Sequence, residues 1–291
     1  MPRLQIGLPV YNGSNYLVEA LDSLLAQTFT DFEILISDNG STDATREIGE
    51  KYAADEARVR YFRYETNRGA AWNFNNVVHL ADAELFEWAA HDDLREPTFL
   101  ERCIEVLDTH RDVVCAYTAT RSVDQDGEPT GGIYTDNCHL MEDSAASRYR
   151  RTLGLYPMHV LFGVVRRDRL VKTRLWGAFA AGDRVAVSEI ALQGKIYEIP
   201  DPLFVRRWHP AVSWVHGMSD RTYAVWYDPR RGAKRLSVPK LRRGVEYAKA
   251  VRHAELSPVQ AVRAYAAWAR FAFWDQGAMA VLRKAGVISK G

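Results

Sequence analysis

The sequence predicts an α/β protein whose mainly parallel central sheet is flanked by helices, in a Rossmann-like arrangement. Over the first 120 residues, short apolar strand patterns alternate with helical patterns. The strand patterns show little polar alternation, which is typical of strands buried on both faces of a parallel sheet. Beyond about residue 210 only helical patterns follow. We therefore expect a sheet domain over residues 1–210 and a helical C-terminal extension over residues 211–291.

Five strands are expected in the first part of the chain, because five short apolar runs with aromatic or β-branched residues are separated by polar segments. A helix is expected after each of the first four. Leu17, Leu21 and Leu24 repeat at helical spacing, with Ser14 as N-cap, and Ser41 or Thr42 caps the next helix. The expected strands are 4–9, 32–37, 59–63, 85–90 and 113–119, and the later helices are 70–80 and 97–110.

The middle of the chain is less regular. Residues 124–129 carry a turn signature, and Gly194 is expected to end a helix over 184–193. The remaining expectations are strands at 158–165, 195–199 and 203–208 and helices at 220–227, 240–253 and 257–285.

Composition restricts the class of protein. The cysteines Cys103, Cys115 and Cys138 are far apart, which argues against a disulfide framework and fits a reducing compartment. A strand pattern begins by Leu4, so no signal peptide is expected, and no apolar run is long enough for a membrane span. These observations predict a cytoplasmic protein.

Charge is unevenly distributed along the chain. Residues 1–205 hold 21 Lys and Arg against 32 Asp and Glu, whereas residues 206–291 hold 17 against 5. The basic region either covers the acidic domain internally or faces an anionic partner. No aromatic and basic module of a known nucleic-acid-binding type is present, so nucleic acid is not expected as a partner.

Chemistry-bearing residues cluster where the expected strands end. Strand one ends in Pro9, Tyr11 and Asn12, strand two in residues 37–43, and strand four in His91-Asp92-Asp93. Ligands of open α/β sheets bind outside the carboxyl ends of strands. Adjacent carboxylates there suit a divalent cation shared with substrate phosphates, although an acidic turn before a helix is the alternative.

Two nucleotide-binding motifs are missing. The first strand-to-helix turn carries only Gly13, so there is no GxGxxG motif, and no GxxxxGK[ST] motif occurs. A dinucleotide-dependent dehydrogenase and a P-loop NTPase are therefore not expected. Tyr11 is placed to stack on a base, and Asp38 or Asn39 to bond a base edge or ribose. Taken alone, residues 38–42 are better explained by a tight turn with a helix N-cap.

In combination these segments resemble family 2 glycosyltransferases of the GT-A fold, including those of bacterial polysaccharide biosynthesis. The resemblance rests on residues 9–12, 27–29, 37–43, 67–69 and 91–93 and covers roughly residues 3–120. It implies an inverting glycosyltransferase (EC 2.4 class) that moves a sugar from a nucleotide-diphosphate donor to an acceptor hydroxyl, with Mn²⁺ or Mg²⁺ as cofactor.

The resemblance also implies residue roles. Asp93 would hold the metal, Asp92 would lie near the donor ribose or sugar, and Arg68 would approach the donor. The base and ribose pocket would be formed by Pro9, Tyr11, Asp38 and Asn39. Many members have a second Asp where this chain has Asn39, so uridine, thymidine and guanosine donors all stay open.

Later residues complete the expected site. Gly182-Asp183 resembles the position of the family's general base, and a plain helix cap is the alternative for Asp183. One of the adjacent arginines, Arg206 or Arg207, is a candidate phosphate clamp, with Arg206 preferred, and His209 is a candidate additional metal ligand. A solvated strand end is the alternative. His159 lies where family members often contact the acceptor, but a satisfied core histidine explains it better.

The tail leaves its partner open. One helical stripe of the tail consists of Val262, Tyr265, Ala266, Ala269, Ala272 and Phe273, and Arg263 and Arg270 lie off it. The stripe could pack onto the sheet domain, form a homodimer or contact a membrane peripherally at its inner face. The acceptor could be a glycan, a lipid-linked sugar or a small molecule. The rival to an enzyme is a non-catalytic sugar-nucleotide or glycan-binding module on the same fold.

Overall fold

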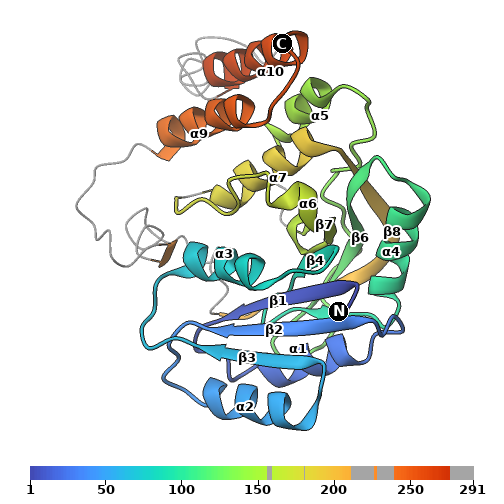
Figure 1. Ribbon diagram of the computed structural model, residues 1–291, viewed down its shortest axis with the longest axis vertical. Helices are drawn as coiled ribbons and strands as arrows, with labels where there is room; N and C mark the ends of the chain where they lie inside the picture. The colour runs from blue at the N-terminus through green and yellow to red at the C-terminus, as the bar shows by residue number, and fades with distance from the viewer. Residues whose placement is uncertain (156–158, 180, 211–225, 228–238, 276–291) are drawn as a thin grey trace.

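A computed structural model defines the architecture (Figure 1). The structure describes residues 1–155, 159–179, 181–210, 226–227 and 239–275. The described part is a mixed eight-stranded sheet with helices on both sides, followed by two C-terminal helices. The α/β expectation is therefore confirmed.

The sheet has the strand order β3-β2-β1-β4-β7-β6-β8-β5. The neighbours within β3-β2-β1-β4 are parallel, and so are β6 and β8. Strand β7 is antiparallel to β4 and β6, and the short β5 is antiparallel to β8. The strands are β1 Leu4–Val10, β2 Phe32–Asp38, β3 Val59–Arg63, β4 Leu85–Trp88, β5 Leu94–Arg95, β6 Val113–Val123, β7 Val164–Arg166 and β8 Lys195–Arg207.

Helices cover both faces of this sheet. In Figure 1, α3, α6 and α7 lie on one side of β1 and β2, and α1 and α2 lie on the other. Helix α4 packs against β6. The helices are α1 Leu17–Leu25, α2 Thr45–Asp55, α3 Ala70–Leu80, α4 Phe99–Thr109, α5 Ala145–Thr152, α6 Arg167–Leu170, α7 Gly182–Gln193, α9 Pro239–His253 and α10 Pro258–Arg270, with a 3₁₀ turn η1 at Val160–Phe162 and a π turn η3 at Phe271–Asp275.

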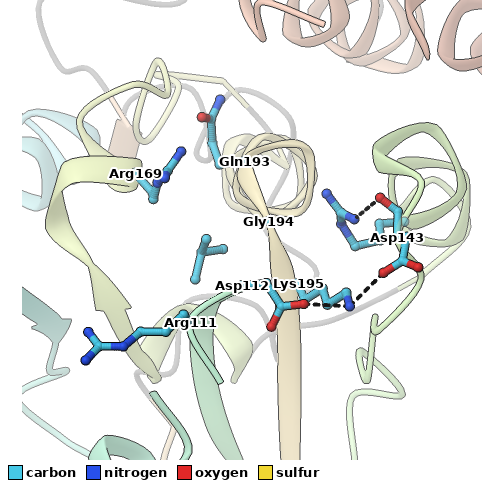
Figure 2. A pocket seen from close by; sticks show the side chains of 9 residues that line it. Arg111, Asp112, Asp143, Arg169, Gln193, Gly194 and Lys195 are labelled. Atoms are coloured by element: carbon cyan, nitrogen blue, oxygen red, sulfur yellow. Dashed lines mark hydrogen bonds and ion pairs between the residues drawn. The ribbon is translucent and has the colours of Figure 1, made fainter. Parts of the chain in front are cut away.

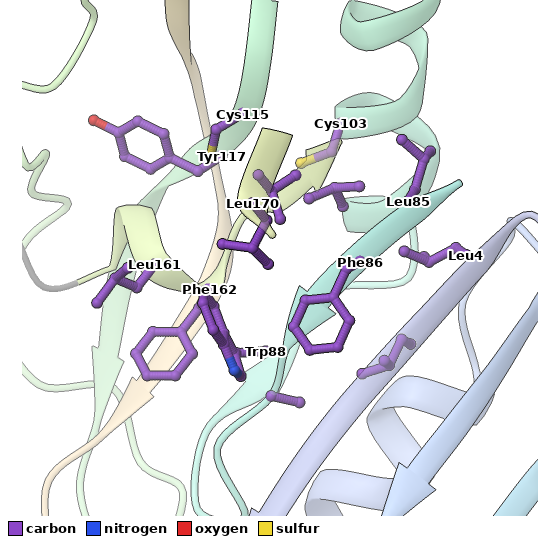
Figure 3. Close-up of a cluster of buried hydrophobic side chains, with 14 of the residues drawn as sticks. Leu4, Leu85, Phe86, Trp88, Cys103, Cys115, Tyr117, Leu161, Phe162 and Leu170 are labelled. Carbon is purple, nitrogen blue, oxygen red and sulfur yellow. The ribbon is translucent and has the colours of Figure 1, made fainter. Parts of the chain in front are cut away.

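The main core lies between the sheet and its helices (Figure 3). Trp88 and Phe86 on β4 stack edge to face at 5.3 Å and have almost no exposed surface. Cys103, Cys115 and Cys138 are all buried and free, which agrees with the expectation from their wide spacing in the sequence. Burial of this many large apolar side chains is the principal stabilising term of the domain.

A second apolar cluster joins the C-terminal helices to α5 and α7. Tyr149 on α5 donates its hydroxyl hydrogen to the carbonyl of Tyr247 on α9 at 2.9 Å. Phe271 stacks edge to face on Tyr247 with ring centroids 5.7 Å apart. The described helices of the extension therefore pack onto the sheet domain through a continuous buried cluster.

Several local expectations were wrong. Helix α1 has Tyr16 rather than Ser14 at its N-cap, and α2 has Ala44 rather than Ser41 or Thr42. In place of a strand over 158–165, the described residues 159–165 form the η1 turn and the start of β7. The two extended segments after Gly194 are one long strand, β8, with a register shift opposite β6.

The expected tail helices are only partly covered by the description. Most of the expected helix at 220–227 lies outside the described residues, as does the tail beyond residue 275. The described helices α9 and α10 agree with the expected ones, and the α10 N-cap Ser257 accepts a hydrogen bond from the N–H of Gln260.

Candidate active site

Two loops that follow β1 and β2 are joined by hydrogen bonds. Asn12 adopts a left-handed backbone conformation with φ of 51°, and its Oδ1 accepts the N–H of Thr42 at 2.8 Å. The N–H groups of Asn12 and Gly13 donate to the hydroxyls of Ser41 and Thr45. Because side-chain oxygens satisfy these backbone donors, the loops form one rigid rim at the carboxyl ends of the strands.

Asp43 contributes to the same rim. Its carboxylate accepts the N–H groups of Ser14 and Thr45. Burial alone would raise the pKa of Asp43, but these hydrogen bonds lower it to about 2. Asp43 is therefore an ionised structural residue that joins the loop after β1 to the start of α2.

Asp38 and Asn39 lie inside this rim and are buried. Asp38 accepts the N–H of Ser41 at 2.8 Å and the hydroxyl of Tyr61 at 2.6 Å. The Asn39 amide nitrogen donates to Asn67 and to the carbonyl of Gly69, and its Oδ1 accepts the N–H of Arg68. In this structure Asn39 therefore anchors the loop at residues 67–69, and its amide hydrogens are not directed toward a base.

Arg68 lies on an aromatic wall. Its guanidinium carbon is 4.6 Å from the ring centre of Trp72 and 5.3 Å from that of Tyr64. Cation–π contacts of this kind hold a side chain in place while its N–H donors stay available. Tyr11, with 42% of its surface exposed, lies on the loop that follows β1, whereas Pro9 is buried in β1 beside Ser37 of β2.

The first loop also lies against the end of β4. A Cβ atom at Gly13 would be 2.5 Å from the His91 ring, so only glycine allows this approach. The loops of β1, β2 and β4 therefore meet at one edge, as the sequence predicted.

Asp92 and His209 contact each other across the sheet. Asp92 Oδ2 is 3.0 Å from His209 Nε2, and the His209 ring contacts the Tyr16 ring in a tilted arrangement with centroids 4.7 Å apart. Burial alone would raise the pKa of Asp92, but His91, His209 and Arg206 lower it below its ordinary value. Asp92 is therefore an ionised carboxylate beside an imidazole nitrogen, which is a donor set that suits a divalent cation.

Asp93 has a different environment. Its side chain has no exposed surface; Oδ2 accepts from Arg206 Nη1 at 3.1 Å and Oδ1 accepts the N–H of Arg207 at 3.1 Å. Burial raises the pKa of Asp93 despite the opposing effect of Arg206, and the adjacent Asp92 raises it further. Both Asp93 oxygens bond protein donors, so the geometry favours Asp92 over Asp93 as the metal-facing carboxylate.

Arg206 and Arg207, at the end of β8, hold this arrangement together. The Arg207 guanidinium donates to the carbonyls of Asp92 and Gln125 and pairs with Glu19 on α1. It also lies 4.8 Å from the Tyr16 ring centre. Sequence reasoning overlooked Tyr16 and Glu19. It considered Arg207 only as an alternative phosphate clamp and not as the residue that ties β8 to Asp92 and α1.

Asp183 is the second residue of α7 and not its N-cap, which is Ala181. The cap interpretation of Asp183 was therefore wrong. Its Oδ1 is buried without a hydrogen-bond partner among the described residues, and burial raises its pKa despite opposition from the Arg184 N–H and from the charges of Arg184 and Arg243. A carboxylate with a raised pKa at a site edge is a candidate proton acceptor.

The loop before α7 is fixed by α3. The side chain of Asn75 bonds the backbone N–H and carbonyl of Trp176 at 2.9 and 3.0 Å. The Trp176 ring lies 4.0 Å from Phe74 and 6.3 Å from Trp88. Helix α7, whose second residue is Asp183, begins on the side toward which β2 and β3 point (Figure 1), and this is the side of the sheet that carries the candidate site.

A cavity of about 310 Å³ lies elsewhere (Figure 2). Lys195, which bridges Asp112 and Asp143 at 2.6 and 2.8 Å, lines it together with Arg111 and Arg169. Lys195 begins β8 and Asp112 precedes β6, so the cavity is at the amino ends of the strands. It is therefore not part of the candidate site.

Within the described ranges no three or more His, Cys, Asp or Glu side chains form a ready metal cluster. A cation held by only one or two protein ligands and by substrate phosphates does not require such a cluster. No helix in the described part of the chain is long and apolar enough to cross a membrane.

The chain belongs to glycosyl transferase family 2, whose family model matches residues 5–175. It is 35% identical over 127 residues to the chondroitin synthase of Escherichia coli, covering 44% of this chain and 18% of that protein. It is 33% identical over 159 residues to an uncharacterised glycosyltransferase of Rickettsia typhi, covering 54% of this chain and 46% of that protein. The chain thus spans less than half the length of these relatives.

Solved structures show the same GT-A fold. The TarS fragment 1–349 of S. aureus matches with a TM-score of 0.66 at 19% identity, over 94% of this chain and 73% of that one. The mannosyltransferase PcManGT of Pyrobaculum calidifontis, solved with GDP-Man and Mn²⁺, matches with a TM-score of 0.59 at 17% identity, over 100% and 76%. TarS 1–349 has also been solved with UDP-GlcNAc.

Proposed function

We propose that the chain is a metal-dependent, inverting glycosyltransferase that moves a sugar from a nucleotide-diphosphate donor to an acceptor hydroxyl. Its product would be a polysaccharide, a glycolipid or a glycosylated natural product. The observation that carries the proposal is the contact of Asp92 with His209 at 3.0 Å, beside the rim formed by the β1 and β2 loops. Family membership and the donor complexes of the structural neighbours support it.

In this proposal Mn²⁺ or Mg²⁺ is held by Asp92 and His209 and by the donor diphosphate. The cation would neutralise negative charge on the leaving diphosphate. Asp93 would act indirectly, because its pairing with Arg206 fixes the guanidinium beside Asp92. This assigns to Asp92 the metal role that sequence reasoning gave to Asp93.

The donor base would lie against the rim of the β1 and β2 loops. Tyr11 has the exposed ring that stacking needs, and Arg68 has a guanidinium supported by Trp72. Asp38 and Asn39 would shape this pocket from behind, since their polar atoms bond the protein. Uridine, thymidine and guanosine donors are all compatible with this arrangement.

Asp183 would accept the proton of the acceptor hydroxyl as its oxygen attacks the anomeric carbon. A single displacement of this kind inverts that carbon. The raised pKa of Asp183 suits a proton acceptor, and its Oδ1 has no hydrogen-bond partner in the described part of the chain. The rival function, a non-catalytic sugar-nucleotide module, would need Asp92 and His209 but not Asp183.

A thermal-shift panel tests the metal assignment. Uridine, thymidine and guanosine diphosphates are compared with and without Mn²⁺, because a ligand at about 100 times its Kd adds roughly 2.7 kcal/mol of stability. Asp92→Asn should lose the metal-dependent part of the shift. Since the lowered pKa of Asp92 shows that its charge stabilises the folded protein, the melting temperature without ligand should fall as well. Asp93→Asn also weakens a buried ion pair, but it should keep the metal-dependent part of the shift. A full metal-dependent shift in Asp92→Asn would refute the assignment.

A further inference from the structure

The outer face of α10 carries an apolar stripe. Val259 is 60% exposed and Val262 is 69% exposed. Ala266 and Ala269 continue the same face at spacings of four and three residues, and Phe273, 58% exposed, follows four residues later. This spacing places all five residues on one side of a helix, where a soluble helix normally carries polar residues.

The opposite face of α10 is already used for packing. Ala264 and Phe271 are buried, the Trp268 ring nitrogen donates to the carbonyl of Gly244 at 2.7 Å, and Gln260 accepts hydrogen bonds from α5. The helix is therefore held by α5 and α9 with its apolar stripe turned outward. The stripe is not needed to attach α10 to the rest of the protein.

Charge on this helix has a single sign. Residues 257–274 contain Arg263 and Arg270 but no Asp or Glu. Both arginines are exposed, and their sequence positions place them on one flank of the stripe. An apolar stripe flanked only by arginines is the pattern of helices that lie in the interface of an anionic membrane.

A second copy of the chain fits this face less well. In an antiparallel pair centred on the middle of the stripe, Arg263 of one copy would lie opposite Arg270 of the other. Like charges at that distance repel each other. Phosphate groups of lipids would instead pair with both arginines.

We propose that the outer face of α10 docks onto an anionic membrane surface, with Val259 and Val262 inserted among the lipid headgroups and Arg263 and Arg270 bound to their phosphates. Membrane binding and the proposed activity can be tested separately, because vesicle binding is measured without a sugar-nucleotide donor. It would hold the protein at a lipid surface without any spanning helix.

Cosedimentation with vesicles tests the proposal, using the full chain with phosphatidylglycerol–phosphatidylcholine vesicles and with pure phosphatidylcholine vesicles. The protein should sediment with the anionic vesicles only, and binding should weaken as salt is raised. The double variant Val259→Glu/Val262→Glu should reduce binding by about tenfold or more. Val171→Glu, which changes an apolar residue that is 46% exposed elsewhere, is the matched control.

A second pair of variants tests the charges. Arg263→Gln/Arg270→Gln should weaken anionic binding, whereas Arg46→Gln/Arg102→Gln removes the same net charge from distant exposed arginines and should not. Absence of binding by the wild-type protein, or equal loss in the controls, would overturn the proposal. A wild-type dimer that Val262→Glu dissociates, without vesicle binding, would overturn it in favour of a self-association surface.

Discussion

Two neighbouring carboxylates at the end of β4 have opposite environments. Asp92 faces His209, whereas Asp93 is buried against Arg206 and the backbone of Arg207. Sequence reasoning could place this pair in the candidate site, because adjacent carboxylates at a strand end suit a divalent cation. It could not predict which carboxylate faces the ligand, because that depends on β8, which lies more than a hundred residues further along the chain.

Asp183→Asn tests the general base. The amide has nearly the size of the carboxylate but cannot accept a proton at neutral pH. We expect kcat to fall by about 10²-fold or more, with donor affinity preserved. Because the raised pKa shows that burial disfavours the charge, the variant should be no less stable than wild type. Asp168→Asn, on the exposed side of α6, is the control.

The pH dependence of kcat gives a second readout for Asp183. A base acts only when deprotonated, so kcat should rise with pH. Since burial raises the pKa of this carboxyl, the midpoint should lie above that of an ordinary aspartate. A wild-type kcat that stays constant as the pH falls to the ordinary pKa range of aspartate would contradict the assignment of Asp183 as the base.

Asn39→Asp tests loop anchoring against base reading. The carboxylate lacks the amide hydrogens that bond Asn67 and Gly69, so the loop that carries Arg68 should loosen. We expect weaker binding of uridine, thymidine and guanosine diphosphates by similar factors, measured by calorimetry. A changed ranking of the three would show that residue 39 reads the base.

At the scale of elements, the parallel half of the sheet was predictable and the antiparallel half was not. Strands β1 to β4 are apolar runs separated by helical patterns, so their order of appearance and type follow from periodicity. Strand β7 has only three residues and follows the η1 turn. Because η1 and β7 are both apolar, their combined sequence has the pattern of one longer strand. Its pairing with both β4 and β6 is set by tertiary contacts that local sequence does not encode.

A buried ion pair links β4 to β5. Glu87 and Arg95 are 2.8 Å apart and nearly without exposed surface, and the guanidinium lies 4.4 Å from the Phe204 ring centre. Burial raises the pKa of Glu87 to about 7 although Arg95 opposes the shift. The Glu87 Oε2 atom has no hydrogen-bond partner in the described part of the chain, which fits a carboxyl that burial leaves partly protonated.

Glu87 makes stability depend on pH. The folded state binds a proton at Glu87 that the unfolded chain releases near its ordinary pKa of 4.5. The free energy of unfolding should therefore fall as pH rises from about 4.5 to about 7. In Glu87→Gln this dependence should be absent, so its stability relative to wild type should increase by about 1–3 kcal/mol between pH 5 and 8. Denaturant titrations of both proteins at both pH values measure this difference in the free energy of unfolding. A difference that does not change with pH would contradict the raised pKa of Glu87.

At the scale of the whole molecule, the GT-A fold and the meeting of the β1, β2 and β4 loops at one edge of the sheet were predictable from strand-end motifs. The contribution of β8 was only partly predictable, because Arg207 contacts Glu19 on α1, which lies 188 residues earlier in the sequence. The described C-terminal helices pack onto α5 and α7, but α10 packs through the face that carries Ala264 and Phe271 and not through the stripe considered from the sequence. Which surface α10 leaves exposed follows only from that packing.

The central claim is that this chain catalyses sugar transfer and does not merely bind a sugar nucleotide. Release of nucleoside diphosphate from UDP-, dTDP- and GDP-sugars, with Mn²⁺ and hydroxyl acceptors, tests it most directly. We predict metal-dependent release by the wild-type protein from at least one donor, and a loss of about 10²-fold or more in Asp183→Asn with donor binding intact. Tight donor binding without release, or equal release by wild type and Asp183→Asn, would contradict the mechanism proposed for this site.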